Sequence, residues 1–234
     1  MITLAFDVYG TLIDTNGVVT ALENQIGDKA QQFSNTWRDK QLEYSFRRGL
    51  MRDYRNFAVC TADALDYTCS YYGIELNDVQ KHSLLSIYRE LPPFKDVMVG
   101  LRQVHSKGYC IYAFSNGLKK AVERLLVNAG INDYFSGIVS VDKLKTFKPN
   151  PDVYHLFMKQ AEVEAEEAWM ISGNPFDVIG AMATGMKAAW VKRSPEAVFD
   201  PWGVEPTITV NNLLELDKGI QDFNTSHKRT RRYS

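Results

Sequence analysis

Leu4-Ala5-Phe6-Asp7-Val8-Tyr9-Gly10-Thr11-Leu12 is the stretch that decides the fold, because an apolar run ends there on an acid and a tight turn follows. Residues 2–6 are apolar or can pack as if they were, which predicts a fully buried strand. Asp7 then stands at the carboxyl end of that strand, where open parallel sheets bind ligands. Gly10 allows the chain to turn sharply beside it. Taken alone, this acid is more simply explained as a loop cap, so the rest of the chain decides.

The composition is that of an ordinary soluble globular protein. The chain has 234 residues, of which 45% are hydrophobic and 24% charged, and its net charge is -1. A net charge so close to zero produces no electrostatic field that would attract nucleic acid or an anionic membrane. No apolar run is long enough to span a bilayer. Cys60, Cys69 and Cys110 lack C-x-x-C spacing, which favours reduced thiols. We therefore expect a cytoplasmic protein without a signal peptide, a nucleic-acid partner or a membrane partner.

Residues 15–93 show helical patterns and no strand pattern. Apolar residues recur at helical spacing over 18–26, 33–51, 54–72 and 79–91, and Pro92-Pro93 stops the last of these helices. The second helix carries an apolar stripe composed of Phe33, Trp37, Leu42, Phe46 and Leu50. We expect this block to be an inserted, all-helical cap domain.

From residue 94 onward, short apolar strands alternate with helices. Strands are predicted at 109–114, 137–141, 169–171, 188–191 and 207–210, and helices at 97–107, 118–129, 151–161, 178–184 and 213–223. This alternation is typical of βαβ units on a parallel sheet. The sequence thus predicts an α/β fold: a doubly wound, parallel-sheet, Rossmann-like core over 1–14 and 94–223, with the cap over 15–93. The basic tail, 224–234, is expected to be frayed.

Chemically competent residues follow four of the predicted strands. They are Asp7 and Thr11, Ser115 and Asn116, Lys148 with Pro149, and Ser172, Asn174 and Asp177. Each alone has an ordinary structural explanation, since Ser115 and Asn116 suit a helix start and Lys148 a surface position. Parallel strands bring their carboxyl ends to one edge of the sheet, so the fold would gather all four groups there.

These motifs resemble the haloacid dehalogenase superfamily and, within it, the L-2-haloacid dehalogenases. The resemblance covers about residues 1–215. Its marks are residues 6–12, Trp37-Arg38-Asp39-Lys40-Gln41-Leu42-Glu43-Tyr44, Ser115-Asn116-Gly117, Lys148-Pro149 with Tyr154, and Ser172-Gly173-Asn174-Pro175-Phe176-Asp177. The Arg38 segment and the Ser172-x-Asn174-x-x-Asp177 pattern are the more specific to dehalogenases.

The resemblance also implies a site without metal or cofactor. Phosphatases of the superfamily hold Mg²⁺ with a second Asp two residues after the nucleophile and an acid four residues before the last motif's Asp. Here those positions are Tyr9 and Gly173, so two oxygen ligands of an octahedral set are missing. Without the metal, a phosphoryl transition state lacks its main charge partner, whereas attack on a halogen-bearing carbon does not need one.

The resemblance implies hydrolytic dehalogenation of short L-2-haloalkanoic acids to D-2-hydroxy acids. Asp7 would attack C2 with inversion and form an ester, while Lys148 keeps it ionised and Arg38 receives the halide. Asp177, with Asn174 and Ser172, would activate water, and backbone N–H groups near Gly10 and Thr11 would bind the oxyanion. The remaining candidates would bind the substrate. Ser115 and Asn116 would donate to its carboxylate. Leu42, Phe57 and Phe176 would form an apolar wall, and Tyr9 and Tyr154 would shape the pocket.

Two other functions stay open from the sequence: an Mg²⁺-dependent phosphatase of small esters, and a catalytically idle binding member. The four histidines lack metal-ligand spacing, and neither G-x-S-x-G nor a nucleotide motif occurs. The resemblance leads us to expect a homodimer joined through apolar cap helices. Retention of Asp7, Arg38, Lys148 and Asp177 favours an enzyme with a haloacid substrate and a halide product.

Overall fold

The computed structural model describes residues 1–230, with side chains through residue 226, and contains one six-stranded sheet. Every strand pair is parallel, and the strand order is β3-β2-β1-β4-β5-β6. The strands are β1 (Thr3–Phe6), β2 (Cys110–Ser115), β3 (Gly137–Ser140), β4 (Ala168–Ser172), β5 (Lys187–Val191) and β6 (Ile208–Val210). This order reverses direction between β1 and β4. The carboxyl end of β1 is therefore at the topological switch point, where such sheets bind ligands.

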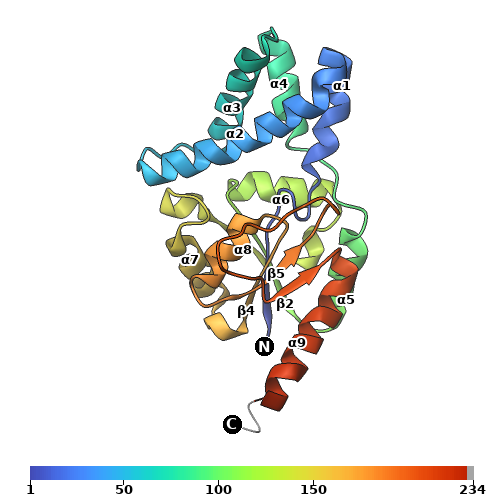
Figure 1. Cartoon of the computed structure of the whole chain (residues 1–234), viewed down its shortest axis with the longest axis vertical. Helices are drawn as coiled ribbons and strands as arrows, with labels where there is room; N and C mark the ends of the chain where they lie inside the picture. The colour runs from blue at the N-terminus through green and yellow to red at the C-terminus, as the bar shows by residue number, and fades with distance from the viewer. Residues whose placement is uncertain (231–234) are drawn as a thin grey trace.

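Helices cover both faces of the sheet (Figure 1). One face is covered by α5 (Val97–Ser106), α6 (Lys119–Asn128) and α9 (Leu216–Thr230), and the other by α7 (Pro151–Ala161) and α8 (Pro175–Met182). All residues of β1 and β4 are buried, as strands sandwiched between two helical layers must be. The predicted doubly wound α/β fold is confirmed.

Four helices lie beyond the carboxyl edge of the sheet and are called the cap helices here (Figure 1). They are α1 (Val19–Ile26), α2 (Ala30–Leu50), α3 (Phe57–Tyr72) and α4 (Asp78–Ile87). The long helix α2 packs along α3, and the indole of Trp37 donates to the carbonyl of Thr61 at 2.9 Å. Asn56 and Asn77 cap the starts of α3 and α4 with their side chains, which fixes where these helices begin.

The chain enters and leaves the cap helices at adjacent points. The N–H of Asp14 donates to the carbonyl of Pro92 at 2.9 Å, and the N–H of Phe94 donates to Leu12 at 3.0 Å. An inserted segment must begin and end at neighbouring points of the core. The hydrogen bonds between residues 12–14 and 92–94 meet this condition for the predicted boundaries at 14/15 and 93/94. The division into two domains stays a prediction.

Several details of the sequence prediction were wrong. Helix α4 ends at Ile87 and not at residue 91, and turns over 88–90 lead to Pro92. Helix α8 begins at Pro175 rather than 178, since proline suits the first helical position. Leu50 is 86% exposed, so the apolar stripe of α2 stops before it. Residues 224–230 continue α9 rather than fraying, and residues 231–234 lie outside the described residues.

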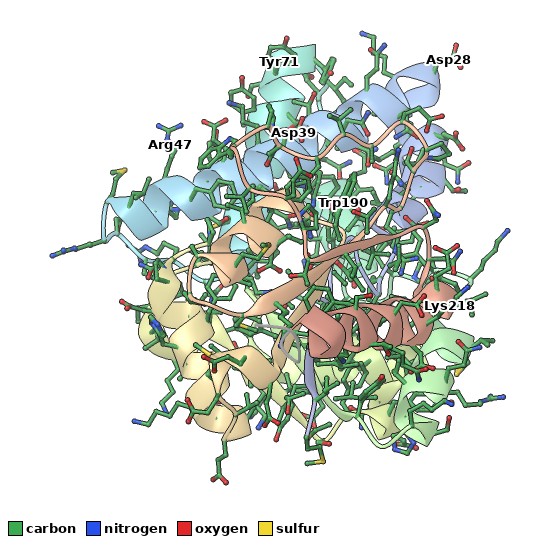
Figure 2. All side chains as sticks on the ribbon, turned by 60° about the horizontal axis from the view of Figure 1, so that its bottom comes forward. Asp28, Asp39, Arg47, Tyr71, Trp190 and Lys218 are labelled. Atoms are coloured by element: carbon green, nitrogen blue, oxygen red, sulfur yellow. The ribbon has the colours of Figure 1, made fainter. Side chains whose placement is uncertain are left out.

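Some charged and aromatic side chains project from the surface. Figure 2 shows Tyr71 and Arg47 projecting from the cap helices and Lys218 from α9. Cys60, Cys69 and Cys110 are free thiols, as predicted, and Cys110 is the least buried of them. Within residues 1–230, no helix is both long and apolar enough to cross a membrane.

Candidate active site

Asp7 is the centre of the site. It follows β1 directly, is 7% exposed, and its two carboxylate oxygens have unequal surroundings. Oδ2 accepts hydrogen bonds from Asn174 Nδ2 at 2.7 Å, Thr11 Oγ1 at 2.8 Å and Ser172 Oγ at 3.3 Å. Among the side chains that the structure describes, Oδ1 accepts only from Lys148 Nζ, at 3.2 Å. Oδ1 therefore keeps a lone pair free for attack, while three donors hold Oδ2 in place.

Lys148 joins two of the predicted site residues. Its side chain is 1% exposed, and its three N–H groups donate to Asp7 Oδ1, to Asp177 Oδ2 at 2.8 Å and to the Phe114 carbonyl at 2.8 Å. The ammonium also lies 4.1 Å from the centre of the Phe114 ring. A buried cation needs such compensation. Its position next to Asp7 suits the predicted role of keeping a carboxylate ionised.

Asp177 lies in the first turn of α8 and is fully buried. Its Oδ1 accepts from the Tyr154 hydroxyl at 2.8 Å and its Oδ2 from Lys148. Burial raises the pKa of Asp177 to about 6, with Asp7 adding to the rise and Lys148 opposing it. Burial also raises the pKa of Tyr154, which keeps its phenol protonated as a donor. Asp177 is thus a carboxyl group that titrates near neutral pH, as a proton acceptor for water should.

Arg38 reaches the site from the cap. Its Nη1 donates to Gln41 Oε1 at 2.6 Å, and its Nη2 donates to the backbone carbonyl of Tyr9 at 3.3 Å. Asn174 Nδ2 donates to the same carbonyl at 3.1 Å. Helix α2 therefore places a cation above the loop that carries Asp7, as the predicted halide-binding role requires.

Gln41 was not predicted, although it holds Arg38. It is fully buried on α2, and its Nε2 donates to Thr61 Oγ1 on α3 at 2.5 Å. A polar residue three positions after Arg38, on the buried side of a helix, is a signal that could have identified it.

The aromatic candidates line the space between cap and core. The Phe57 ring lies 5.9 Å from the ring of Tyr9, and the Phe176 ring lies 5.0 Å from that of Phe46 on α2. Burial raises the pKa of Tyr9 to about 12, although Arg38 opposes the rise, so Tyr9 stays a neutral donor. Leu42 is half-buried.

Two hollows border the site. The first, called the cap cavity here, has a volume of about 120 Å³ and is lined by Tyr9, Gln41, Phe57, Ala58, Thr61, Leu85, Tyr88, Arg89, Gly117, Leu118 and Ala121. The second is a groove of about 710 Å³ between α2 and α8, whose lining includes Phe46, Lys148 and Phe176. Leu42 lines neither hollow, so the geometry lends this candidate less support than Phe57 or Phe176.

Ser115 and Asn116 end β2 beside Lys148. Ser115 Oγ accepts from the N–H of Gly117 at 3.0 Å, and Asn116 Oδ1 accepts from the backbone N–H of Lys148 at 3.0 Å. The hydroxyl proton of Ser115 and the amide of Asn116 are left to donate, and Asn116 is 7% exposed. They can therefore bind an anion at the start of α6, where the helix dipole also favours negative charge.

A second unpredicted pair holds the turn after Asp7. Arg193 Nε donates to the carbonyl of Thr11 at 3.0 Å, and its Nη1 donates to both carboxylate oxygens of Asp96 at 2.8 Å. Asp96 Oδ2 also accepts from the N–H of Leu213 at 2.7 Å. Arg193 follows β5, so the strand-end rule used for the other candidates could have found it.

The residues present do not fit a magnesium site. A Cβ atom at Gly173 would lie 2.5 Å from the carbonyl oxygen of Gly10, so an acidic side chain there would require the backbone to shift. Tyr9 supplies a phenol instead of a carboxylate, and the charge of Asp7 is met by the ammonium of Lys148. Within residues 1–230, no three His, Cys, Asp or Glu side chains form a group that could hold a metal.

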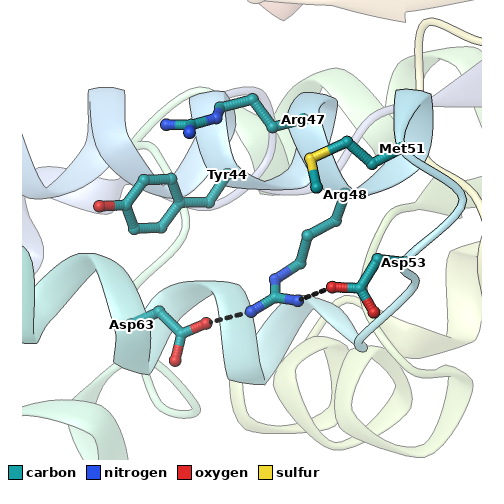
Figure 3. Close-up of a pocket in the computed structure, with 6 residues that line it drawn as sticks. All are labelled: Tyr44, Arg47, Arg48, Met51, Asp53 and Asp63. Carbon is teal, nitrogen blue, oxygen red and sulfur yellow. Dashed lines mark hydrogen bonds and ion pairs between the residues drawn. The ribbon is translucent and has the colours of Figure 1, made fainter.

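A separate pocket of about 290 Å³ on the cap contains none of the predicted site residues (Figure 3). In it, Arg48 donates to Asp53 at 2.9 Å and to Asp63 at 2.8 Å. The pair with Asp63 ties the end of α2 to α3, and the pair with Asp53 ties it to the loop between them. Both help to fix the helix that carries Arg38.

Comparison with known proteins identifies the class that this fold and site define. The family model described as haloacid dehalogenase-like hydrolase matches residues 2–185, and the chain belongs to that family. The family resemblance predicted from the motifs is thus confirmed.

Curated relatives match nearly the whole chain. Haloacetate dehalogenase H-2 of Moraxella sp. (strain B) is 37% identical over 207 residues, covering 88% of this chain and 92% of the relative. An (S)-2-haloacid dehalogenase of Pseudomonas putida is 35% identical over 217 residues, covering 93% and 95%.

Solved structures agree with these relatives. The L-2-haloacid dehalogenase from Xanthobacter autotrophicus aligns with a TM-score of 0.88 at 30% identity, covering 95% of this chain and 99% of that one. Its structure with chloropropionic acid covalently bound aligns with a TM-score of 0.87 at 31% identity, covering 94% and 99%.

Proposed function

We propose that this enzyme hydrolyses short L-2-haloalkanoic acids to D-2-hydroxy acids through an ester on Asp7. The observation that carries the proposal is the environment of Asp7: four donors orient its carboxylate, Lys148 balances its charge, and no second acid can stand at Gly173. Relatives named as (S)-2-haloacid dehalogenases support the substrate class.

In the first step, Asp7 Oδ1 attacks C2 of the substrate from the side opposite the halogen. The C–O bond forms as the carbon–halogen bond breaks, the halide leaves with the bonding electrons, and C2 is inverted. Arg38 lies on the cap side of Asp7 and receives the halide. Ser115, Asn116 and the start of α6 bind the substrate carboxylate.

In the second step, water attacks the carbonyl carbon of the Asp7 ester. Asp177 accepts the proton of this water, directly or through the Lys148 and Tyr154 hydrogen bonds that meet at it. The tetrahedral oxyanion collapses, and the bond between Cγ and the oxygen attached to C2 breaks. That oxygen takes up the proton held by Asp177, so the product leaves as a 2-hydroxy acid and Asp7 is again a carboxylate. Because the oxygen of water ends in Asp7, isotope labelling distinguishes this route from direct hydrolysis.

One experiment tests the covalent route. A single turnover of L-2-chloropropionate in H₂¹⁸O, followed by mass spectrometry of the peptide carrying Asp7, is expected to place the label on Asp7. Label in the product but never in Asp7 would refute the ester. Halide release should be abolished in Asp7→Asn and unaffected by EDTA.

A phosphatase is the alternative enzyme. Hydrolysis of p-nitrophenyl phosphate that rises with Mg²⁺ and stops with EDTA would support it against the dehalogenase. The crowding at Gly173 argues against this alternative, because the second acidic ligand has no room. An idle binding protein would bind haloacids without releasing halide.

We also propose a cytoplasmic homodimer that associates through the cap helices. Leu50, Met51 and Tyr71 are large apolar or aromatic side chains that are 86%, 69% and 65% exposed on or next to these helices. Light scattering behind size-exclusion chromatography should give twice the chain mass. A monomer at micromolar concentration would contradict the dimer.

A further inference from the structure

Tyr88 has a buried hydroxyl without a protein partner. The side chain follows α4, is 6% exposed, and its ring lies 4.8 Å from that of Trp37. Among the described residues, no hydrogen-bonding group meets this hydroxyl. A buried polar group without a partner is costly, so it is retained where something from outside the chain pairs with it.

The hydroxyl belongs to a residue that lines the cap cavity. This cavity of about 120 Å³ also touches Tyr9, two residues after the nucleophile, and Gly117, next to Asn116. Its volume exceeds that needed for a single water, and its walls combine aromatic rings with the polar groups of Gln41 and Arg89. The cap cavity is thus a ligand-sized space that adjoins the reacting centre.

The position of Tyr88 is on the leaving-group side. In a displacement at carbon, the nucleophile and the leaving group lie on opposite sides of the atom attacked. Asp7 belongs to the core sheet, whereas Arg38 on α2 and Tyr88 after α4 belong to the cap. A halide that leaves C2 on the side away from the core sheet would therefore meet the cap, to which these two residues belong.

The protonation state of Tyr88 also allows it to donate a hydrogen bond to an anion. Burial raises the pKa of Tyr88 to about 12, and the neighbouring Arg38 guanidinium partly opposes the rise. The phenol therefore keeps its proton at neutral pH and can donate it in a hydrogen bond. Since Arg38 already uses Nη1 for Gln41 and Nη2 for Tyr9, an additional donor beside it would complete the coordination of an anion.

Resting on the proposed function, we propose that the Tyr88 hydroxyl is a second donor, beside Arg38, to the halide that leaves C2. No proton is transferred: the halide takes the bonding electrons and accepts a hydrogen bond as its charge develops. Because chloride concentrates its charge more than bromide or iodide, it gains most from such a donor. Tyr88 is thereby a residue that sets halogen preference.

The substrate carboxylate has its own donors elsewhere. Ser115 and Asn116 stand at the end of β2 on the core side, next to Lys148. A donor to the carboxylate would act equally on every 2-haloacid, whereas a donor to the leaving group acts according to the halogen. This contrast makes the assignment testable.

The test compares Tyr88→Phe with wild type in single-turnover halide release from L-2-chloro-, L-2-bromo- and L-2-iodopropionate. Loss of a hydrogen bond to a charged group is expected to slow chloride release by about tenfold to thirtyfold. Bromide release should slow less, and iodide release by no more than about twofold. The melting temperature should be unchanged or higher, since the variant removes an unpaired polar group.

Tyr72→Phe is the matched control, because it removes another tyrosine hydroxyl from the cap. That hydroxyl already has partners in Thr36 and Gln32, and its loss should affect the three halogens equally or not at all. An equal loss for all three halogens in Tyr88→Phe, or no loss, would overturn the assignment to the halide. Failure of the wild-type enzyme to release any halide would instead overturn the proposed function, and this proposal with it.

Discussion

The Nζ atom of Lys148 lies 2.8 Å from Oδ2 of Asp177, and the same ammonium lies 3.2 Å from Oδ1 of Asp7. One buried cation is therefore shared by the predicted nucleophile and the predicted proton acceptor. One ammonium cannot balance the negative charges of two carboxylates. Burial of Asp177, together with the nearby charge of Asp7, raises the pKa of Asp177 to about 6. The pH dependence of the two chemical steps should differ as a result.

Hydrolysis of the Asp7 ester is expected to slow as pH falls, because protonated Asp177 cannot accept a proton from water. The pKa of Asp177 is raised to about 6 by burial and by the charge of Asp7, and the ester removes that second cause. The step should therefore be slower at pH 5 than at pH 8 by at most about tenfold, since the ionised fraction falls tenfold per pH unit below the pKa. The measurement is quenched-flow mass spectrometry of the Asp7 peptide. The ester should accumulate at pH 5 while the halide burst persists. Equal ester lifetimes at both pH values would exclude Asp177 as the base.

Lys148→Met is expected to destabilise the fold and abolish turnover. Removing one partner from a buried ionic cluster typically costs about 3–5 kcal/mol, because the remaining charge is left uncompensated. The loss of stability should be smaller near pH 4, where protonation removes the repulsion between Asp7 and Asp177 that the ammonium no longer offsets. Urea unfolding at pH 4 and pH 7 measures both values.

Lys218→Met serves as the control for Lys148→Met, since Lys218 is exposed on α9 (Figure 2). It should change stability by no more than about 0.5 kcal/mol at either pH. A Lys148→Met protein as stable as this control would show that the ion pairs at the site do not contribute to folding.

Gly173→Ala should be destabilising by about 1–3 kcal/mol, the usual cost of inserting a methyl group into packed structure. The added Cβ would meet the backbone carbonyl of Gly10 at 2.5 Å, which no side-chain rotation can relieve. Gly219→Ala is the contrasting variant. Its Cβ meets only side-chain methyl groups, Ile208 Cδ1 at 3.0 Å and Val210 Cγ1 at 3.5 Å, and helix α9 gains from alanine. Thermal denaturation of both variants checks the prediction, which a stable Gly173→Ala would contradict.

Gln41→Leu is expected to slow halide release by about tenfold, because Arg38 loses the acceptor that orients it. Gln31→Leu, an exposed change on the same helix, should have no effect. If both variants release halide at the wild-type rate, the position of Arg38 does not depend on Gln41.

The sheet and the acids and bases at its edge could be predicted because both follow from local pattern. Apolar runs mark the strands, and a parallel sheet necessarily collects the residues that follow them. Asp7, Lys148 and Asp177 therefore meet in the structure as the fold class requires. Arg38 lies in a cap helix and follows no strand, so only the family resemblance identified it as a site residue.

Other residues could not be predicted because their roles depend on how the cap sits over the core. Helical periodicity indicates that α2 has a buried side, but not what that side faces, so Leu50 was wrongly placed in its stripe. Gln41 and Tyr88 acquire their surroundings only when α3 and α4 pack against α2. Tertiary packing decides these positions. The spacing of Gln41 from Arg38 indicates a shared side of α2 but not the contact with Thr61, and no local spacing points to Tyr88.

The backbone carbonyl of Tyr9 accepts from Arg38 of the cap and from Asn174 of the core. Asn174 also orients the carboxylate of Asp7. The peptide oxygen of Tyr9 is thus a point at which helix α2 of the cap and the core residue that orients Asp7 are bound to the same acceptor. A change in the position of Arg38 would alter a hydrogen-bond acceptor that it shares with Asn174, and Asn174 in turn contacts the carboxylate of Asp7.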